Sequence, residues 1–341
     1  MDVIQLAEEI VDGRRLSREE AIGLLLEAPL EELQQGADEI RKHFCGDTVN
    51  LCTIINGRSG KCSENCKYCA QSSHYNTACR EYPFLPKEEI LAEAVSHDKE
   101  GVDRFSVVTS GRTLAGAEFE KALEAYEEMA RVCPELELCA SHGLLSRQQF
   151  SRLKKAGVGR YHANIETSER NFPNICTTHS FKDKIDVIKM AKEEGLQVCS
   201  GGIIGMGETW EDRIDMALTL GELGVTSIPL NVLTPIPGTA FADVEPLKEE
   251  EILRTVTLFR YLAPTGDIRL AAGRSLLTNF GESAFKGGAN ATITGNMLTT
   301  LGFTIESDRK LMERMGRKLS RDAKPSDSCD VAGGTAVARK M

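Results

Sequence analysis

The chain has 341 residues, with 41 lysines and arginines against 51 aspartates and glutamates, so its formal net charge is −10. This acidic balance argues against the class of nucleic-acid-binding proteins that depends on neutralising phosphates. No run approaches the roughly 20 apolar residues that span a membrane, and residues 1–9 are acidic where a secretory signal is basic. We therefore expect a cytoplasmic protein with neither a nucleic acid nor a membrane as partner.

The first segment, residues 1–47, is predicted to be a helical extension. Ser17 and Glu20 have the spacing of a capping box, and apolar residues then recur every three or four positions, as at Ile22 and Leu25.

Residues 48–319 alternate short strand-like runs with longer helical runs, which is the pattern of repeated βα units with a parallel sheet. Eight such units predict the α/β class and a closed (β/α)8 TIM-type barrel, with the functional loops after the strands. The tail, residues 320–341, shows no sustained periodicity and is predicted to be disordered. The expected strands are 51–56, 104–109, 135–141, 160–166, 197–204, 227–233, 268–272 and 291–294, and the clearest helices are 119–130, 180–194 and 211–223.

Three of the eleven cysteines, Cys62, Cys66 and Cys69, follow the first predicted strand with the spacing CxxxCxxC. In a reducing compartment cysteines of this kind ligate metals more often than they form disulfides. Three thiolates on a four-iron cluster leave one iron open to a substrate or cofactor, so a [4Fe–4S] cluster is the leading interpretation. A zinc site and three buried thiols are the alternatives.

This spacing, with Tyr68 before the third cysteine, resembles the signature of radical S-adenosylmethionine enzymes. The resemblance implies that the open iron binds S-adenosylmethionine, whose reductive cleavage supplies a 5′-deoxyadenosyl radical. The longer motifs resemble the biotin synthase family over residues 20–318. They are residues 56–73 (NGRSGKCSENCKYCAQSS), 198–209 (VCSGGIIGMGET), 229–231 (PLN) and 269–274 (RLAAGR).

The biotin synthase resemblance implies an enzyme that inserts sulfur between C6 and C9 of dethiobiotin. The adenosyl radical removes hydrogen from the C9 methyl group, a sulfide of an auxiliary iron–sulfur cluster traps the carbon, and a second cofactor molecule activates C6. Flavodoxin or ferredoxin is the implied reductant. Iron–sulfur assembly proteins are the other implied partners, and a homodimer is the implied assembly.

Strand alternation by itself predicts a polar barrel interior. Cys139 shares one face of the third strand with Glu137, and Cys199 lies on the corresponding face of the fifth. Arg104 and Arg269 would enter the same interior from the second and seventh strands. Buried cations need anionic partners, and a thiolate-ligated cluster would be one.

The resemblance also implies an auxiliary cluster held by three strand cysteines and an arginine. Cys139, Cys199 and Arg269 match that pattern, whereas Ser106 stands where the second-strand cysteine is expected. Serine is a poor ligand for soft metals, so we hypothesise that Cys52 of the first strand replaces it. The alternative is that Cys52 is a small buried hydrophobe. The cluster would be [2Fe–2S] or a larger four-iron form.

Further roles are carried over from the same resemblance. The alternative interpretation of Asn164 and Glu166 is a solvated strand end that binds no ligand. The alternative interpretation of His162 is a core histidine whose hydrogen bonds are made within the protein. The remaining cysteines, Cys45, Cys79, Cys133, Cys176 and Cys329, are interpreted as structural or free thiols. The predicted catalytic residues are Cys62, Cys66, Cys69 and Arg269; the cofactor-binding residues are Tyr68, Asn164, Glu166, Gly201, Gly202 and Ile203; the substrate-binding residues are Asn231, Thr299 and Thr300.

Two rival functions share parts of this pattern. Another radical enzyme on the same barrel, such as a maturase or an amino-acid mutase, would have no reason to place cysteines and an arginine in the interior. A non-catalytic iron–sulfur carrier or zinc-stabilised binding protein would cleave no cofactor.

Overall fold

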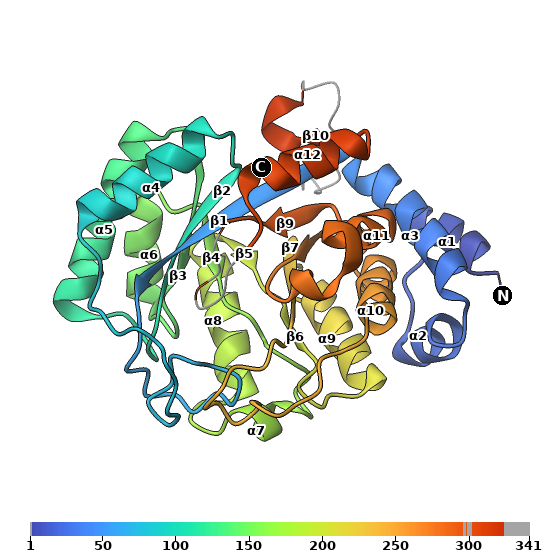
Figure 1. Cartoon of the computed structure of the whole chain (residues 1–341), viewed down its shortest axis with the longest axis horizontal. Coiled ribbons are helices and arrows are strands. Elements are labelled where there is room, and N and C mark those ends of the chain that lie inside the picture. The colour runs from blue at the N-terminus through green and yellow to red at the C-terminus, as the bar shows by residue number, and fades with distance from the viewer. Residues whose placement is uncertain (1, 296–297, 299–301, 324–341) are drawn as a thin grey trace, which may run out of the picture.

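The computed structural model describes residues 2–295, 298 and 302–323. Its parallel strands form a closed ring, because β1 pairs with β2 on one side and with β9 on the other. Around the ring the order β1, β2, β3, β4, β5, β7, β8, β9 follows the chain, and helices surround the sheet (Figure 1). The predicted (β/α)8 TIM-type barrel is confirmed.

The elements lie close to the predicted segments. The strands are β1 (Thr48–Arg58), β2 (Arg104–Thr109), β3 (Glu137–Ser141), β4 (Arg160–His162), β5 (Gln197–Cys199), β6 (Gly202–Ile204), β7 (Ser227–Val232), β8 (Asp267–Leu270), β9 (Ala291–Ile293) and β10 (Lys318–Leu319). The helices are α1 (Val3–Val11), α2 (Arg18–Leu25), α3 (Leu30–Cys45), α4 (Lys87–Lys99), α5 (Gly116–Val132), α6 (Arg147–Lys155), α7 (Phe172–Ile175), α8 (Phe181–Glu193), α9 (Trp210–Glu222), α10 (Glu249–Leu262), α11 (Glu282–Lys286) and α12 (Ile305–Arg314).

The alternation of side chains along each strand separates the core from the barrel interior. On β2, Phe105 and Val107 are buried in the apolar core under the helices, while Ser106 faces the interior cavity. On β3, Leu138 belongs to the core and Cys139 to the cavity. The period of two in the sequence thus sorts packing residues from residues available for chemistry.

The segment predicted as one fifth strand is divided into β5 and β6. A Cβ at Gly201 would lie 1.9 Å from the Pro229 carbonyl oxygen, so the backbones of this segment and β7 are in close contact. Pro229 has no N–H to donate to its neighbour. On the opposite side, toward β4, the Gly201 carbonyl accepts from the backbone N–H groups of Ile165 and Glu166, at 3.0 and 3.2 Å. The ladder is therefore interrupted beside the active cavity.

The N-terminal helices pack on the side of the barrel that carries α9 and α10 (Figure 1). The capping box is present, since the Ser17 side chain accepts from the Glu20 N–H and the Glu20 carboxylate accepts from the Ser17 N–H. The Tyr261 hydroxyl of α10 donates to the Val3 carbonyl at 3.0 Å. Arg18 of α2 pairs with Asp215 of α9 at 2.6 Å. These contacts attach α1–α3 to the outer helix layer.

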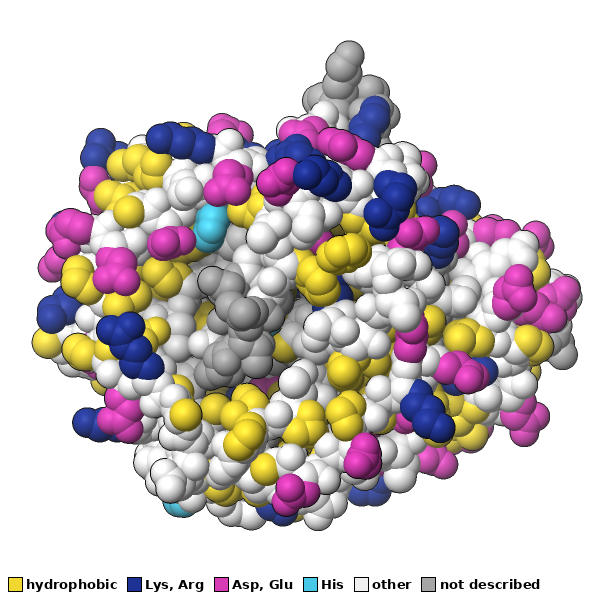
Figure 2. Space-filling view, in the orientation of Figure 1, with side chains coloured by type: hydrophobic (Ala, Val, Ile, Leu, Met, Phe, Trp, Pro, Cys, Tyr) yellow, Lys and Arg dark blue, Asp and Glu magenta, His cyan; other side chains and the backbone are white. Residues whose placement is uncertain are grey.

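The last described segment of the chain, with α12 and β10, packs against the barrel. β10 pairs with the start of β1, where Thr48 is opposite Lys318. The tail predicted to be disordered begins with a 3-10 turn at Ser320–Asp322, where Arg321 pairs with Asp98 at 2.7 Å, so its first residues correct that prediction. Its remainder, from residue 324 onward, lies outside the described residues. Acidic and basic side chains are interspersed across the face seen in Figure 2. Within the described part of the chain, no helix is both long and apolar enough to cross a membrane.

Candidate active site

A cavity of about 330 Å³ occupies the barrel interior and collects most of the predicted site residues. Its wall includes Cys69 of the motif and the strand cysteines Cys52, Cys139 and Cys199. Cys52 and Cys199 are 147 positions apart in the sequence. The predicted residues on the wall are Cys52, Tyr68, Cys69, Ser106, Cys139, Asn164, Glu166, Cys199, Ile203, Asn231 and Arg269.

The loop after β1 holds the CxxxCxxC motif in a compact turn. The Cys62 N–H donates to the Gln71 carbonyl at 3.0 Å, and the Cys69 N–H donates to the Cys66 carbonyl at 3.0 Å. Burial, with a smaller contribution from Cys62, raises the pKa of the Cys69 thiol to about 11. A bound cation would supply the charge that favours its thiolate. Cys69 lines the cavity, whereas Cys66 lies against Cys176.

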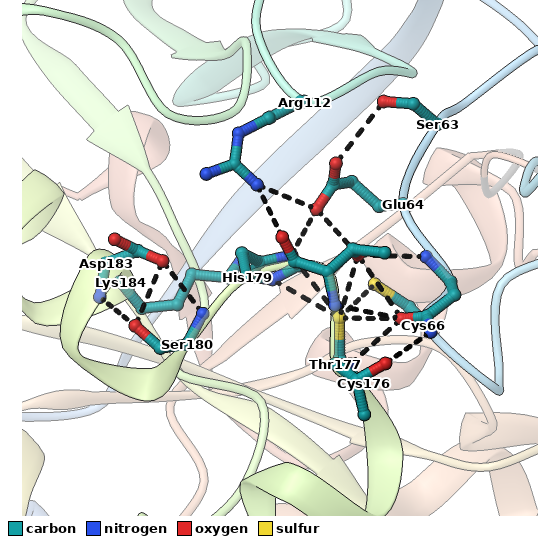
Figure 3. Close-up of polar contacts among 12 residues, drawn as sticks. Ser63, Glu64, Cys66, Arg112, Cys176, Thr177, His179, Ser180, Asp183 and Lys184 are labelled. Atoms are coloured by element: carbon teal, nitrogen blue, oxygen red, sulfur yellow. Dashed lines mark hydrogen bonds and ion pairs between the residues drawn. The ribbon is translucent and has the colours of Figure 1, made fainter.

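A group of polar side chains surrounds Cys66 (Figure 3). Its sulfur is 3.7 Å from the Cys176 sulfur, which is 3.3 Å from His179 Nδ1. His179 Nδ1 in turn lies 2.6 Å from a Glu64 carboxylate oxygen. The hydrogen bond between the two thiols raises the pKa of Cys66 and lowers that of Cys176. Sequence analysis missed this group, although the CxxH spacing of Cys176 and His179 is a recognisable ligand pattern.

Deep in the barrel, Cys52, Cys139 and Cys199 come from three different strands. Burial raises the pKa values of Cys52 and Cys139. The Cys199 thiolate charge raises both values further, and the Cys52 charge also raises that of Cys139. Ser106 is directly opposite Cys139 in the β2–β3 register, and its buried hydroxyl oxygen has no hydrogen-bond partner in the described chain. Both Cys52 and Ser106 therefore remain available as the third protein ligand.

His162 is not merely a satisfied core histidine, because it lies opposite Cys199 in the β4–β5 register and on the cavity wall. Burial opposes a charged thiolate, but the neighbouring His162 ring and the Arg269 charge lower the pKa of Cys199 to about 6. The Cys199 thiol lies 3.5 Å from the Ser227 hydroxyl. Burial likewise opposes a charged imidazole, yet the interaction with Cys199 raises the pKa of His162. The pair favours an anionic sulfur at this position.

The two interior arginines have different environments, which corrects one expectation from the sequence. Arg104 does not need a cluster as its anion, because it pairs with Glu137 at 2.6 Å and with Asp267 at 3.1 Å. Arg269 donates to neutral acceptors, the carbonyls of Asn50 and Thr292, and its distance to Asp267 is 3.9 Å. Burial, together with the Arg104 charge, lowers the pKa of Arg269. Its charge is therefore the less compensated of the two.

Glu166, the predicted cofactor ligand, sits on strained backbone. Its φ of 70° lies in the left-handed region that carboxylate side chains rarely adopt. Its oxygen Oε2 is buried and unpartnered within the described residues, and Lys184 Nζ is 3.8 Å from the other oxygen. Burial and the nearby Glu166 charge raise the pKa of Tyr68. A solvated strand end does not describe this carboxylate, since only 8% of the residue is exposed.

The glycines and amides predicted to bind ligands have backbone partners. At Gly202 a Cβ would lie 2.4 Å from the Glu166 carbonyl oxygen, so Gly202, like Gly201, permits a close approach to the neighbouring backbone. Asn164 accepts from the Gly201 N–H at 3.0 Å. The Asn231 amide donates to the Gly202 carbonyl at 3.1 Å and accepts from the Ala272 N–H at 3.2 Å, which leaves one amide hydrogen for a ligand.

Two of the predicted substrate-binding residues, Thr299 and Thr300, lie outside the described residues. The described residue next to them, Leu298, lines the cavity.

Comparisons with known proteins assign the chain to a family. The Radical SAM superfamily model matches residues 58–220, and the Biotin and Thiamin Synthesis associated domain matches residues 229–318. The chain is 58% identical to the biotin synthase of Alkaliphilus metalliredigens, over 93% of this chain and 99% of that protein. It is 55% identical to the biotin synthase of Clostridium beijerinckii, over 92% and 98%. This chain belongs to the biotin synthase family.

A likeness among solved structures supports the same fold. The structure of methylornithine synthase superposes with a TM-score of 0.80 at 19% identity, covering 94% of this chain and 98% of that one. At this identity the likeness concerns the barrel alone.

Membership of the biotin synthase family implies a [4Fe–4S] cluster and S-adenosylmethionine, and the residues present fit both. Three motif thiols offer the soft donors that iron prefers and leave one iron free. The unpartnered oxygen of Glu166 lies on the wall of the cavity reached by Cys69, where a ribose hydroxyl could donate to it. The buried, unpartnered Ser106 hydroxyl marks a second polar position deeper on the same wall.

Proposed function

We propose that this chain converts dethiobiotin to biotin by inserting one sulfur atom between C6 and C9, in the barrel cavity. The observation that carries the assignment is that Cys69 of the motif and the deep thiols Cys52, Cys139 and Cys199 line one cavity. A reaction that joins radical formation to sulfur transfer needs both sets of donors within reach of one substrate. The cavity supplies that proximity and limits access of water.

Cys62, Cys66 and Cys69 are the proposed ligands of the [4Fe–4S] cluster. When bound, this cluster and S-adenosylmethionine supply a carbon radical able to remove hydrogen from an unactivated carbon. Backbone hydrogen bonds from Cys62 to Gln71 and from Cys69 to Cys66 fold this loop into a compact turn, which supports the proposal.

Cys139, Cys199 and Arg269 are the proposed ligands of the auxiliary cluster, with Cys52 as third thiol and Ser106 as its competitor. Arg269 supports an anionic group here, because its charge is the least compensated of the interior arginines. His162 supports the neighbouring Cys199 thiolate. Either a [2Fe–2S] cluster or a larger four-iron form is compatible with this donor set.

The cavity wall beside Cys69 is the proposed cofactor pocket. Tyr68, Asn164, Glu166 and Ile203 would orient the cofactor, while Gly201 and Gly202 shape the neighbouring backbone. Asn231 would donate its remaining amide hydrogen to the ureido carbonyl of dethiobiotin. Thr299 and Thr300 stay predicted contacts for its carboxylate.

The wider assembly follows from the same proposal. Flavodoxin or ferredoxin would deliver electrons, and iron–sulfur assembly proteins would load the clusters. The homodimer, the cytoplasmic location and the division into residues 1–47, 48–319 and 320–341 stay predictions.

The test is anaerobic reconstitution with iron and sulfide, followed by a reductant, S-adenosylmethionine and dethiobiotin. We expect both 5′-deoxyadenosine and biotin, measured by mass spectrometry. Cys69→Ala should abolish both products, and Cys133→Ala, which removes a buried thiol outside the cavity, should abolish neither. Formation of 5′-deoxyadenosine without biotin would point to another radical enzyme. Absence of both products from the reconstituted wild-type chain would leave only an iron–sulfur carrier.

A further inference from the structure

Cys176 and His179 form a cluster of potential ligands that the proposed function does not use. Both residues lie in the segment between α7 and α8. Cys176 is 110 positions from Cys66 in the sequence, yet the two sulfurs are 3.7 Å apart. The ligand atoms of Cys66, Cys176 and His179 all lie within 4.8 Å of one another. Figure 3 shows the Cys176 and His179 side chains converging on Cys66.

Two of the three distances among these atoms match the edges of a tetrahedral metal site, and the third is within 4.8 Å. With Zn–S bonds of about 2.3 Å and Zn–N bonds of about 2.0 Å, two sulfur ligands lie about 3.8 Å apart and a sulfur and a nitrogen about 3.5 Å apart. The corresponding distances here are 3.7 Å between the two sulfurs and 3.3 Å from the Cys176 sulfur to His179 Nδ1. A metal ion could be accommodated with only small side-chain movements.

The scaffold around the three side chains is already ordered by its own hydrogen bonds. The Asn65 side-chain oxygen accepts from the backbone N–H groups of Thr177 and Thr178, at 2.9 and 3.2 Å. This bond ties the motif loop to the segment that carries Cys176. His179 is 5% exposed at its side chain and packs edge-on against the Phe172 ring, with centroids 5.6 Å apart. Such a preordered site loses little conformational entropy when it binds a metal.

The fourth coordination position has a candidate on the same loop. One Glu64 carboxylate oxygen lies 2.6 Å from His179 Nδ1 and 2.9 Å from the Thr178 hydroxyl. A small rotation would let this carboxylate or a water molecule complete a tetrahedron. Two thiolates, an imidazole and an oxygen make a ligand set typical of zinc, and one that Co²⁺ and Fe²⁺ also accept.

We propose that Cys66, Cys176 and His179 form a mononuclear site for a divalent transition metal in the chain that lacks its [4Fe–4S] cluster. Because Cys66 cannot serve a mononuclear ion and the cluster at once, the two metal states exclude each other. This second statement rests on the proposed function, since it takes Cys66 as a cluster ligand. Zinc in this site would therefore block cluster assembly on the motif.

The first experiment measures Co²⁺ binding to the full-length, cluster-free chain in the Cys62→Ser/Cys69→Ser background, where Cys66 is the last motif thiol. We expect a Co²⁺ site with thiolate-to-cobalt charge-transfer absorption, displaced by Zn²⁺, that is counted as the difference from the same background with Cys176→Ser, because the deep thiols are common to both chains. Cys176→Ser or His179→Gln in this background should weaken that site by at least roughly 10- to 100-fold, the loss that even an outer-shell change brings. Cys133→Ser is the matched control and should leave it unchanged.

Circular dichroism of each variant shows whether it has folded. Because Cys176→Ser is nearly isosteric, it tests the site even if His179→Gln proves unstable. Equal Co²⁺ stoichiometry and affinity in the background chain and in the folded Cys176→Ser chain would overturn the proposal.

The second experiment tests the competition and separates it from the proposed function. The cluster-free wild-type chain is incubated with one equivalent of Zn²⁺ and then reconstituted with iron and sulfide, and bound iron is read from the iron–sulfur absorption. We expect zinc to slow cluster formation in the wild-type chain and to have little effect in Cys176→Ser. A cluster that forms equally well with and without zinc would refute the competition, whereas a cluster that fails to form even without zinc would refute the proposed function.

Discussion

Single side chains would determine which atoms ligate the proposed deep cluster. Cys52 and Ser106 both line the cavity, on neighbouring strands, and Ser106 is opposite Cys139 in the sheet. A thiolate binds iron far better than a serine hydroxyl does. The chemistry of the donor atoms therefore favours Cys52 as the ligand. The unpartnered Ser106 hydroxyl could then bind a neighbouring polar group.

Substitution at these two positions distinguishes the candidates. Cys52→Ala should lose the auxiliary iron and sulfide and with them biotin formation, while the motif cluster still cleaves S-adenosylmethionine. Ser106→Ala should keep both clusters. Iron and sulfide analysis with electron paramagnetic resonance provides the measurement, and full retention of auxiliary iron in Cys52→Ala would assign the third ligand elsewhere.

A second residue-scale prediction concerns His142, a buried histidine outside the cavity. Its ring nitrogens lie 3.0 Å from the Thr109 hydroxyl and 2.9 Å from the Tyr126 hydroxyl. Burial, with a smaller contribution from Arg58, lowers its pKa to about 3. The folded chain therefore binds fewer protons here than the unfolded chain between about pH 6.5 and pH 3.

The resulting stability is present above pH 6.5 and is lost as the pH falls, by about 1.4 kcal/mol per pH unit. His142→Gln should remove this part of the slope, although loss of the ring lowers stability at neutral pH. Urea unfolding of the cluster-free chain from pH 7 to pH 4.5 provides the measurement. His43→Gln is the matched control, because it makes the same substitution at an exposed position. An equal slope in His142→Gln would contradict the assignment.

At the scale of elements, the interrupted fifth strand shows how backbone packing shapes the cavity. The sequence predicts one strand over 197–204, because β-branched residues at both of its ends favour a strand. The division into β5 and β6 depends on Pro229 of the adjacent strand, which removes a donor from the ladder and approaches Gly201 closely. Propensity within one segment could not show this contact.

Gly201→Ala tests that packing. The added Cβ would lie 1.9 Å from a backbone oxygen, which cannot rotate away, so we expect a loss of at least about 1–3 kcal/mol in the free energy of unfolding. Gly23→Ala in α2 is the matched control, because a Cβ there meets nothing within 4 Å. It should stabilise the chain by about 0.5–1 kcal/mol. Chemical denaturation measures both, and a neutral Gly201→Ala would contradict the close contact.

At the scale of the whole molecule, a buried ion pair joins the end of the barrel to α12. Arg274 Nη2 is 2.6 Å from an Asp308 carboxylate oxygen, and the side chains are 2% and 0% exposed. Arg274 also donates to the Thr292 hydroxyl at 3.0 Å. The pair thereby links the loop after β8, strand β9 and α12.

Asp308→Ala should lower the free energy of unfolding by about 3–5 kcal/mol, because it leaves a buried guanidinium without its anion. Glu306→Ala, which removes an exposed partner of Lys310 on the same helix, should leave stability nearly unchanged. Thermal unfolding of the two variants provides the comparison, and equal losses would show that the buried pair is not important for closure.

The sequence alone determined the barrel, the motif and the faces of the strands. Hydrophobic periodicity and the CxxxCxxC spacing are local properties, so the pattern places Cys139 inside the barrel and Leu138 outside without knowledge of any neighbour. The family resemblance added the match of Cys199 and Arg269 to an auxiliary ligand set. Cys139, Cys199 and Arg269 all lie on the cavity wall.

Only the tertiary structure decided which distant groups meet. Closure of the ring brings Glu137 and Asp267 to Arg104, which removes that arginine's need for a cluster. Packing of the segment after α7 against the motif loop brings Cys176 to Cys66. The physical reason is that the register between strands and the docking of loops depend on contacts across the whole barrel, which no spacing along one segment records.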